Sequence, residues 1–209
     1  VLSVPRALWF RVTTARPRLR LALRPDLLRL DVFVFLLHAM LTASFVALPF
    51  VLNDALQLPL AEHWRLYVMA LLLSLVGTVP LIVADERQGK QWTLSIAVLL
   101  LLAGQLLLWA AGDQRPAVLA GLVLFFAGFN FLEAGLPARL SIMASADLRG
   151  ASLGVFASCQ FAGAFAGGLL GGLVLGFGEP ATVFMACAAM AAAWLLLVAP
   201  AALKRPENA

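Results

Sequence analysis

Six long runs of apolar residues constrain this 209-residue chain more than any other feature of its sequence. Each run is roughly 18 to 25 residues long, and a helix needs about 20 residues to cross a hydrocarbon layer of ~30 Å. The chain is 63% hydrophobic and 12% charged, so it has too few polar side chains to cover a surface that faces water. We therefore expect an all-α integral membrane protein with spans at residues 32–52, 66–83, 93–111, 117–138, 152–177 and 181–199.

The breaks between the runs are short, which favours an up-and-down bundle of neighbouring antiparallel helices. A transmembrane barrel would instead show alternating polarity over stretches of about ten residues, and the sequence contains no such stretch. The expected organisation is a basic segment at 1–29, a six-helix bundle at 30–200 and a tail at 201–209. Because the basic segment starts at Val1 and leads straight into a span, we expect the sequence to begin part-way through a longer protein rather than with a targeting peptide.

Positive charge is divided unequally between the two sides of the expected bundle. Of the 15 Lys and Arg residues, only Arg65 and Arg115 fall on one side. The positive-inside rule places the other, more basic side in the cytoplasm, and with it both termini. Since the basic residues flank the spans, we expect the lipid bilayer to be their partner and not nucleic acid.

Neither the cysteines nor the histidines indicate a metal or redox site. Cys159 and Cys187 lie inside apolar runs, where a thiol behaves as a small hydrophobe. His38 and His63 lie on different segments and lack the spacing of metal ligands. We expect no metal ion and no bound cofactor.

An internal repeat relates the first three spans to the last three. The first span ends in Ala-Leu-Pro-x-x-Leu around Pro49, and the fourth ends in Gly-Leu-Pro-x-x-Leu around Pro137, 88 residues later. The same offset carries the second and third spans onto the fifth and sixth. Because each unit has an odd number of spans, the second unit is expected to be inverted in the membrane, as in transporters built from a 3+3 inverted repeat.

The loop after the second span resembles a family signature. Its sequence Glu86-Arg87-Gln88-Gly89-Lys90 is similar to the G-x-x-x-D-R-x-G-R loop of the major facilitator superfamily. Ile82, Glu86 and Lys90 stand where the family prefers Gly, Asp and Arg.

Two further stretches strengthen this resemblance. Arg149-Gly150-x-x-x-Gly154 is similar to the R-G-x-x-x-G that opens helix 11 of these transporters. The run from Phe129 to Pro137 is similar to helix 10 of the bacterial drug/proton antiporter branch. Residues 26–200 thus resemble helices 7 to 12, the C-terminal six-helix half of a major facilitator transporter.

The resemblance implies a secondary transporter of the bacterial inner membrane. It implies proton-coupled efflux of small organic molecules by alternating access, driven by the proton gradient. The transport path would lie between this half and an N-terminal six-helix half outside this sequence.

The loop signature is expected to form a cytoplasmic gate. A carboxylate of Asp85 or Glu86 can meet Arg87, Lys90 or a helix N-terminus and so tie adjacent helices together. Gly89 completes the gate loop. A solvated turn of mixed charges is the alternative.

A carboxylate within the fourth span is the strongest candidate for function. Glu133 lies about six residues inside the end of that span, or ~9 Å deep by helix rise. A charged carboxylate at a helix centre costs about 2.5 to 3.5 kcal/mol, so Glu133 should face a cavity or a partner. Asn130 shares its helix face at i, i+3.

His38 lies at a similar depth in the first span, about seven residues in, or ~10 Å by helix rise, with Thr42 on the same face. In the resembled fold these spans are helices 7 and 10, which line the central cavity, so His38 and Glu133 are expected to share a layer there. Glu133, His38, Asn130 and Thr42 form the candidate proton and substrate pathway. The alternative is that His38 and Glu133 form a purely structural pair. Gln105 and Gln160 are expected to make interhelical hydrogen bonds.

Small residues repeat at i, i+4 along the fifth span. Such spacing lets helix backbones approach closely in lipid. We expect this helix to be a tight packing element through Gly163, Gly167, Gly168, Gly171 and Gly172.

An enzymatic function is disfavoured. Gly150-Ala151-Ser152-Leu153-Gly154 matches G-x-S-x-G, but a nucleophile elbow follows a strand, and no histidine follows Ser152. A channel or a non-transporting membrane scaffold stays open as an alternative to a transporter.

Overall fold

Six helices that are long and apolar enough to cross a membrane make up the described part of the chain. The computed structural model describes residues 24–88 and 92–203 and contains no strand in those ranges. The protein is therefore an all-α membrane protein with six spans, as the sequence predicts. The helices, with two short irregular turns after the first, are α2 (Pro25–Phe50), η2 (Val51–Ala55), η3 (Leu60–Glu62), α3 (His63–Gln88), α4 (Trp92–Ala110), α5 (Arg115–Met143), α6 (Arg149–Phe177) and α7 (Pro180–Leu203).

The helices extend beyond the expected spans, most of all at the start of α2. This helix begins at Pro25, where the fixed φ of proline suits the first turn and its missing N–H is not needed. Residues 25–29, which the sequence assigned to the basic segment, are therefore helical. At its other end α2 continues through Pro49 into the π-turn η2, so the following loop starts later than expected.

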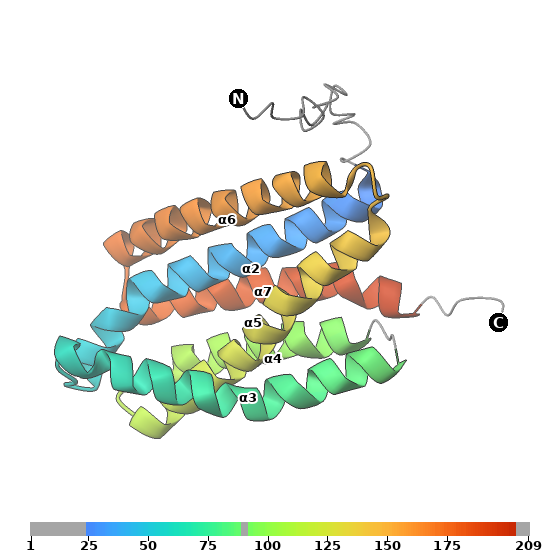
Figure 1. Ribbon diagram of the computed structural model, residues 1–209. Coiled ribbons are helices and arrows are strands. Elements are labelled where there is room, and N and C mark those ends of the chain that lie inside the picture. The colour runs from blue at the N-terminus through green and yellow to red at the C-terminus, as the bar shows by residue number, and fades with distance from the viewer. Residues whose placement is uncertain (1–23, 89–91, 204–209) are drawn as a thin grey trace, which may run out of the picture.

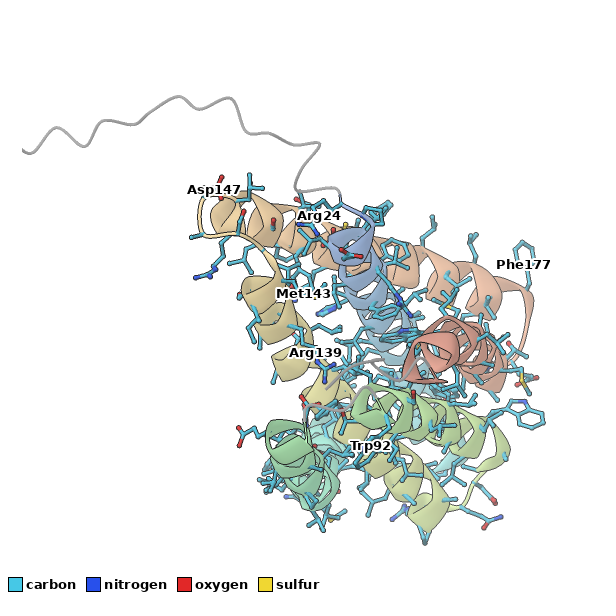
Figure 2. The ribbon with its side chains drawn as sticks, turned by 90° about the vertical axis from the view of Figure 1, so that its right-hand side faces the viewer. Arg24, Trp92, Arg139, Met143, Asp147 and Phe177 are labelled. Atoms are coloured by element: carbon cyan, nitrogen blue, oxygen red, sulfur yellow. The ribbon has the colours of Figure 1, made fainter. Side chains whose placement is uncertain are left out.

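One end of the bundle collects the starts of α2, α4 and α6 and the ends of α3, α5 and α7 (Figure 1). Figure 2 views the bundle from this end, where Arg24 and Arg139 are labelled. Arg29 and Arg149 also lie in helix segments at this end. We call it the basic end, defined by Arg24, Arg29, Arg139 and Arg149.

The helix contacts repeat under the 88-residue offset, which pairs α2 with α5, α3 with α6, and α4 with α7. α2 packs against α6 and α7, and α5 packs correspondingly against α3 and α4. The two remaining equivalent helices, α4 and α7, pack against each other. Figure 1 shows α2 and α5 running in opposite directions. These contacts and directions are those that an inverted repeat requires.

The core lies where α2, α4, α5 and α7 meet. Its largest fully buried side chains include Trp194, Phe125, Phe131 and Phe184, and the rings of Phe33 and Trp194 lie 5.3 Å apart between α2 and α7.

In contrast, α3 and α6 expose large apolar side chains. Val76 of α3 and Phe165 of α6 are each 76% exposed. An apolar surface of this kind suits lipid or another membrane helix and not water.

Candidate functional site

Three polar side chains from three helices meet inside the bundle. His38 of α2 places Nε2 3.5 Å from Glu133 Oε2 of α5. Gln160 of α6 places its amide Nε2 2.9 Å from His38 Nε2 and donates to Glu133 Oε1 at 3.4 Å. We call His38, Glu133 and Gln160 the polar cluster.

The backbone of α2 fixes the orientation of the His38 ring. His38 Nδ1 lies 3.1 Å from the Val34 carbonyl oxygen, which can only accept, so Nδ1 carries a proton. The ring also packs edge-on against Phe129, with centroids 5.8 Å apart. These contacts leave Nε2 to face Glu133 and Gln160.

The cluster opens to one side through Glu133. The His38 side chain is 10% exposed, whereas that of Glu133 is 41% exposed. A proton on His38 Nε2 would turn the contact with Glu133 into a charge-assisted pair. It would also require Gln160 to present its carbonyl oxygen instead of its NH₂ group, because an NH₂ group only donates. The neighbours of His38 Nε2 thus come from two other helices, α5 and α6.

The remaining two candidates of the pathway do not join the cluster. Asn130 donates to Ser74 Oγ of α3 at 3.1 Å. Thr42 donates to the His38 carbonyl oxygen at 3.0 Å, within its own helix. The Asn130 side chain thus joins α5 to α3, whereas the Thr42 hydroxyl group bonds only within α2.

The two glutamines inside the spans bond to different partners. Gln105 of α4 donates to Ser44 Oγ of α2 at 2.8 Å, which is the interhelical bond that the sequence predicts. Gln160 of α6 also bonds across helices, as the sequence predicts, and its partners place it in the polar cluster, although sequence reasoning did not include it in the pathway. A polar residue at mid-span was the available signal, but periodicity did not reveal which helix it faces.

At the basic end, Asp85 ties three helices together. Its Oδ1 accepts hydrogen bonds from Arg139 Nη2 of α5 at 2.5 Å and from Thr93 Oγ1 of α4 at 2.6 Å. The Asp85 and Arg139 side chains are 26% and 23% exposed. A charge-assisted bond in this partly buried setting is stronger than a fully exposed pair.

This contact involves one residue of the expected gate, Asp85, and adds two that were not expected. The carboxylate is that of Asp85, and Thr93 lies in the first turn of α4, so a helix N-terminus takes part. Among the described side chains the basic partner of Asp85 is Arg139 of α5, which sequence reasoning missed because it is distant in the chain. Glu86 is exposed, and the Arg87 side chain, Gly89 and Lys90 lie outside the described part.

The glycines of α6 divide into two groups. Gly163, Gly167 and Gly171 face the backbone of α2, where a methyl group at Gly167 would overlap the Ala39 carbonyl oxygen. A methyl group added at Gly168 would only approach the Thr42 methyl group, and one added at Gly172 would have no neighbour within 4 Å. The second group therefore does not pack closely against the described helices.

An additional carboxylate was missed because the first expected span began one residue after it. Asp31 of α2 is 1% exposed. Neither of its carboxylate oxygens has a hydrogen-bond partner among the described residues.

A cavity of about 620 Å³ also lies at the basic end. Arg139 lines it together with Arg29 and Asp26, so the cavity borders the Asp85 contact and not the polar cluster. Arg29 also donates to the Leu197 carbonyl oxygen of α7 at 2.7 Å.

Comparison with known proteins finds transporters. No family model matches the chain. It is 37% identical over 172 residues to the inner membrane transport protein YajR of Escherichia coli (strain K12), covering 82% of this chain and 38% of that protein. It is 25% identical over 155 residues to an uncharacterized transporter of Buchnera aphidicola subsp. Baizongia pistaciae, covering 72% of this chain and 39% of that protein. A further Buchnera protein, the uncharacterized transporter BU466 of subsp. Acyrthosiphon pisum, is 28% identical over 137 residues, which are 64% of this chain and 34% of that protein.

The chain thus spans less than two fifths of the length of each of these relatives. All three names describe transport and none describes catalysis. Together with the six apolar helices, they support a membrane transporter and give no support to an enzyme.

Proposed function

We propose that this chain is one six-helix half of a proton-coupled transporter of the major facilitator superfamily. In this proposal the protein lies in a bacterial inner membrane with its basic end in the cytoplasm. It exports small organic molecules by alternating access. The helix contacts that repeat under the 88-residue offset support this architecture, and the similarity to an inner membrane transport protein supports the location and the class.

The observation that carries the coupling proposal is the contact between His38 and Glu133. An imidazole nitrogen and a carboxylate oxygen can share a proton in a charge-assisted hydrogen bond, and here His38 Nε2 lies 3.5 Å from a carboxylate oxygen of Glu133. One proton can therefore be held between the two groups. Its arrival or departure changes contacts among α2, α5 and α6, which gives proton binding a direct mechanical consequence.

A second six-helix half is proposed to cover the exposed apolar faces of α3 and α6. The substrate would then lie between the two halves, where Glu133 is open to one side. An apolar cavity with a few polar groups is the usual form of a site for small organic molecules.

The contact of Asp85 with Arg139 and Thr93 is proposed to be the cytoplasmic gate. It joins α3, α5 and α4 at one end only. Relative movement of these helices would have to break it, so it favours one gate state.

The full-length gene product, reconstituted in proteoliposomes under an imposed pH gradient, tests this function. We expect a panel of fluorescent hydrophobic cations to be moved against their gradient in wild type. Flux should fall to background in Glu133→Gln with unchanged protein yield. Glu62→Gln is the matched control, because Glu62 pairs with Arg65 outside the cluster. Gradient-driven flux that persists in Glu133→Gln would contradict the coupling role.

A further inference from the structure

A buried carboxylate lies in the seam between α2 and α6. Phe35, Ala39 and Ala43 of α2 meet Gly163, Gly167 and Gly171 of α6 in parallel rows with i, i+4 spacing. One turn towards the basic end, these rows continue to Asp31 on α2 and Cys159 on α6. The Asp31 carboxylate and the Cys159 thiol interact electrostatically, which agrees with their facing positions in the two rows.

The seam excludes water from Asp31. The backbones of α2 and α6 touch at Gly163, one turn away, and both carboxylate oxygens of Asp31 are buried. Charged carboxylates are seldom buried in this way without a partner, because they lose their hydration.

Among residues 24–88 and 92–203, none of the neighbouring charged groups is placed to compensate an ionised Asp31. On α2, Arg29 reaches across to the Leu197 carbonyl of α7, and Asp26 pairs with Arg24. His38 lies two turns further along α2, in the polar cluster. The other helices add few groups: α5 carries Arg139, bound to Asp85, and Glu133, bound within the polar cluster.

α6 and α7 contribute little more. In the sequence of α6 the sole charged residue is Arg149, ten residues before Cys159 and thus ~15 Å away by helix rise. α7 has no charged residue between Pro180 and Leu203, and Cys187 is its one titratable group.

We propose that Asp31 is a second proton-binding site, which holds a proton while α2 packs against α6 and loses it when this seam opens. While α2 packs against α6, the neutral carboxyl group of Asp31 avoids the free-energy cost of burying a charge that has lost its hydration. When the seam opens, water reaches the carboxyl group, its O–H bond breaks, the proton passes to water, and a hydrated carboxylate remains.

The position of Asp31 gives this site a relation to the polar cluster. Asp31 and His38 are seven residues apart on α2, so they share one helix face and lie ~10 Å apart along it. Asp31 is the nearer of the two to the basic end. Proton binding at Asp31 is independent of the proposed transport function. Only the passage of a proton from Asp31 towards His38 rests on that function.

Infrared spectroscopy of the full-length gene product in lipid vesicles tests the site without any substrate. We expect wild type to show a protonated-carboxyl C=O band at pH values where exposed carboxylates are ionised. The band should persist in Asp26→Asn, the control on the same helix, whose side chain is 58% exposed. It should lose intensity in Asp31→Asn, which retains the shape of the neutral acid and should keep wild-type thermal stability. A band of unchanged intensity in Asp31→Asn, or no such band in wild type, would overturn the assignment.

A second pair of variants tests the link to the seam. Gly163→Ala forces a methyl group against the Phe35 backbone, whereas Gly172→Ala meets nothing within 4 Å. We expect the Asp31 band to be lost in Gly163→Ala and retained in Gly172→Ala. An unchanged band in folded Gly163→Ala would show that the proton does not depend on the closed seam.

Discussion

Ala39 of α2 and Ala127 of α5 are 88 residues apart and occupy equivalent positions in the two halves of the bundle. The Ala39 backbone lies directly against Gly167 of α6. The Ala127 carbonyl oxygen accepts a hydrogen bond from Thr78 Oγ1 of α3 at 3.2 Å. The two contacts differ in chemistry, but each joins the first helix of one repeat to the second helix of the other.

Gly167→Ala should destabilise the protein by about 1 to 3 kcal/mol, the usual cost of overpacking a tight contact. The added methyl group would overlap the Ala39 carbonyl oxygen, and neither backbone can move aside without disturbing the seam. Gly172→Ala is the control, with no change or a small gain expected, because its methyl group meets nothing. Thermal unfolding of both variants in the same detergent provides the measurement. Equal stability of the two would show that the seam is not tightly packed.

Replacing Asp85 and Arg139 singly and together should reveal an interaction energy of about 1 kcal/mol. Asp85→Asn, Arg139→Gln and the double variant form a double-mutant cycle, read from unfolding free energies. Glu86→Gln, next to Asp85 but exposed, should have no measurable effect. Purely additive losses from the two single changes would mean that the contact does not hold the basic end together.

Gln160→Leu should impair gradient-driven flux while leaving stability within about 1 kcal/mol of wild type. The amide of Gln160 contacts both partners of the polar cluster. Gln105→Leu is the matched control, because Gln105 is fully buried but bonds to Ser44 outside the cluster. We expect Gln105→Leu to change thermal stability and to leave flux per folded molecule intact. The reverse pattern would make Gln160 a packing residue.

Cysteine labelling tests the orientation of the bundle. In a background without Cys159 and Cys187, cysteines at Asp54 and Gln114, both exposed, should react with a membrane-impermeant thiol reagent in intact cells. A cysteine at Ala146, exposed at the basic end, should react only after permeabilisation. Labelling of Ala146 alone from outside would reverse the proposed topology.

Much of the fold follows from one-dimensional patterns in the sequence. Apolar run length gives the six spans, and one offset between Pro49 and Pro137 identifies equivalent helices. The contact between His38 and Glu133 was predictable because helix rise fixes the depth of each residue, and the resembled family supplied which helices face the cavity.

Lateral neighbours could not be predicted in the same way. Arg139 binds Asp85 from a position 54 residues away in the chain, because the end of α5 lies beside that of α3. Periodicity predicts two rows of glycine on α6, but only the rotation of that helix decides that Gly171 packs and Gly172 does not. Hydropathy also places the start of α2 too late, since it treats Asp31 as a boundary when the helix carries this carboxylate into the bundle.

The seam between α2 and α6 has a consequence for biogenesis. Phe35 and Gly163 touch, yet 128 residues separate them in the order of synthesis. At translation rates of about 5 to 20 residues per second, α2 precedes its partner helix by roughly 6 to 25 seconds. During that interval the newly made helix must keep Asp31 and His38 in the membrane without the surface that later shields them. Insertion of this chain therefore includes a waiting period, in which a membrane chaperone or the translocon itself would protect the early helix from degradation.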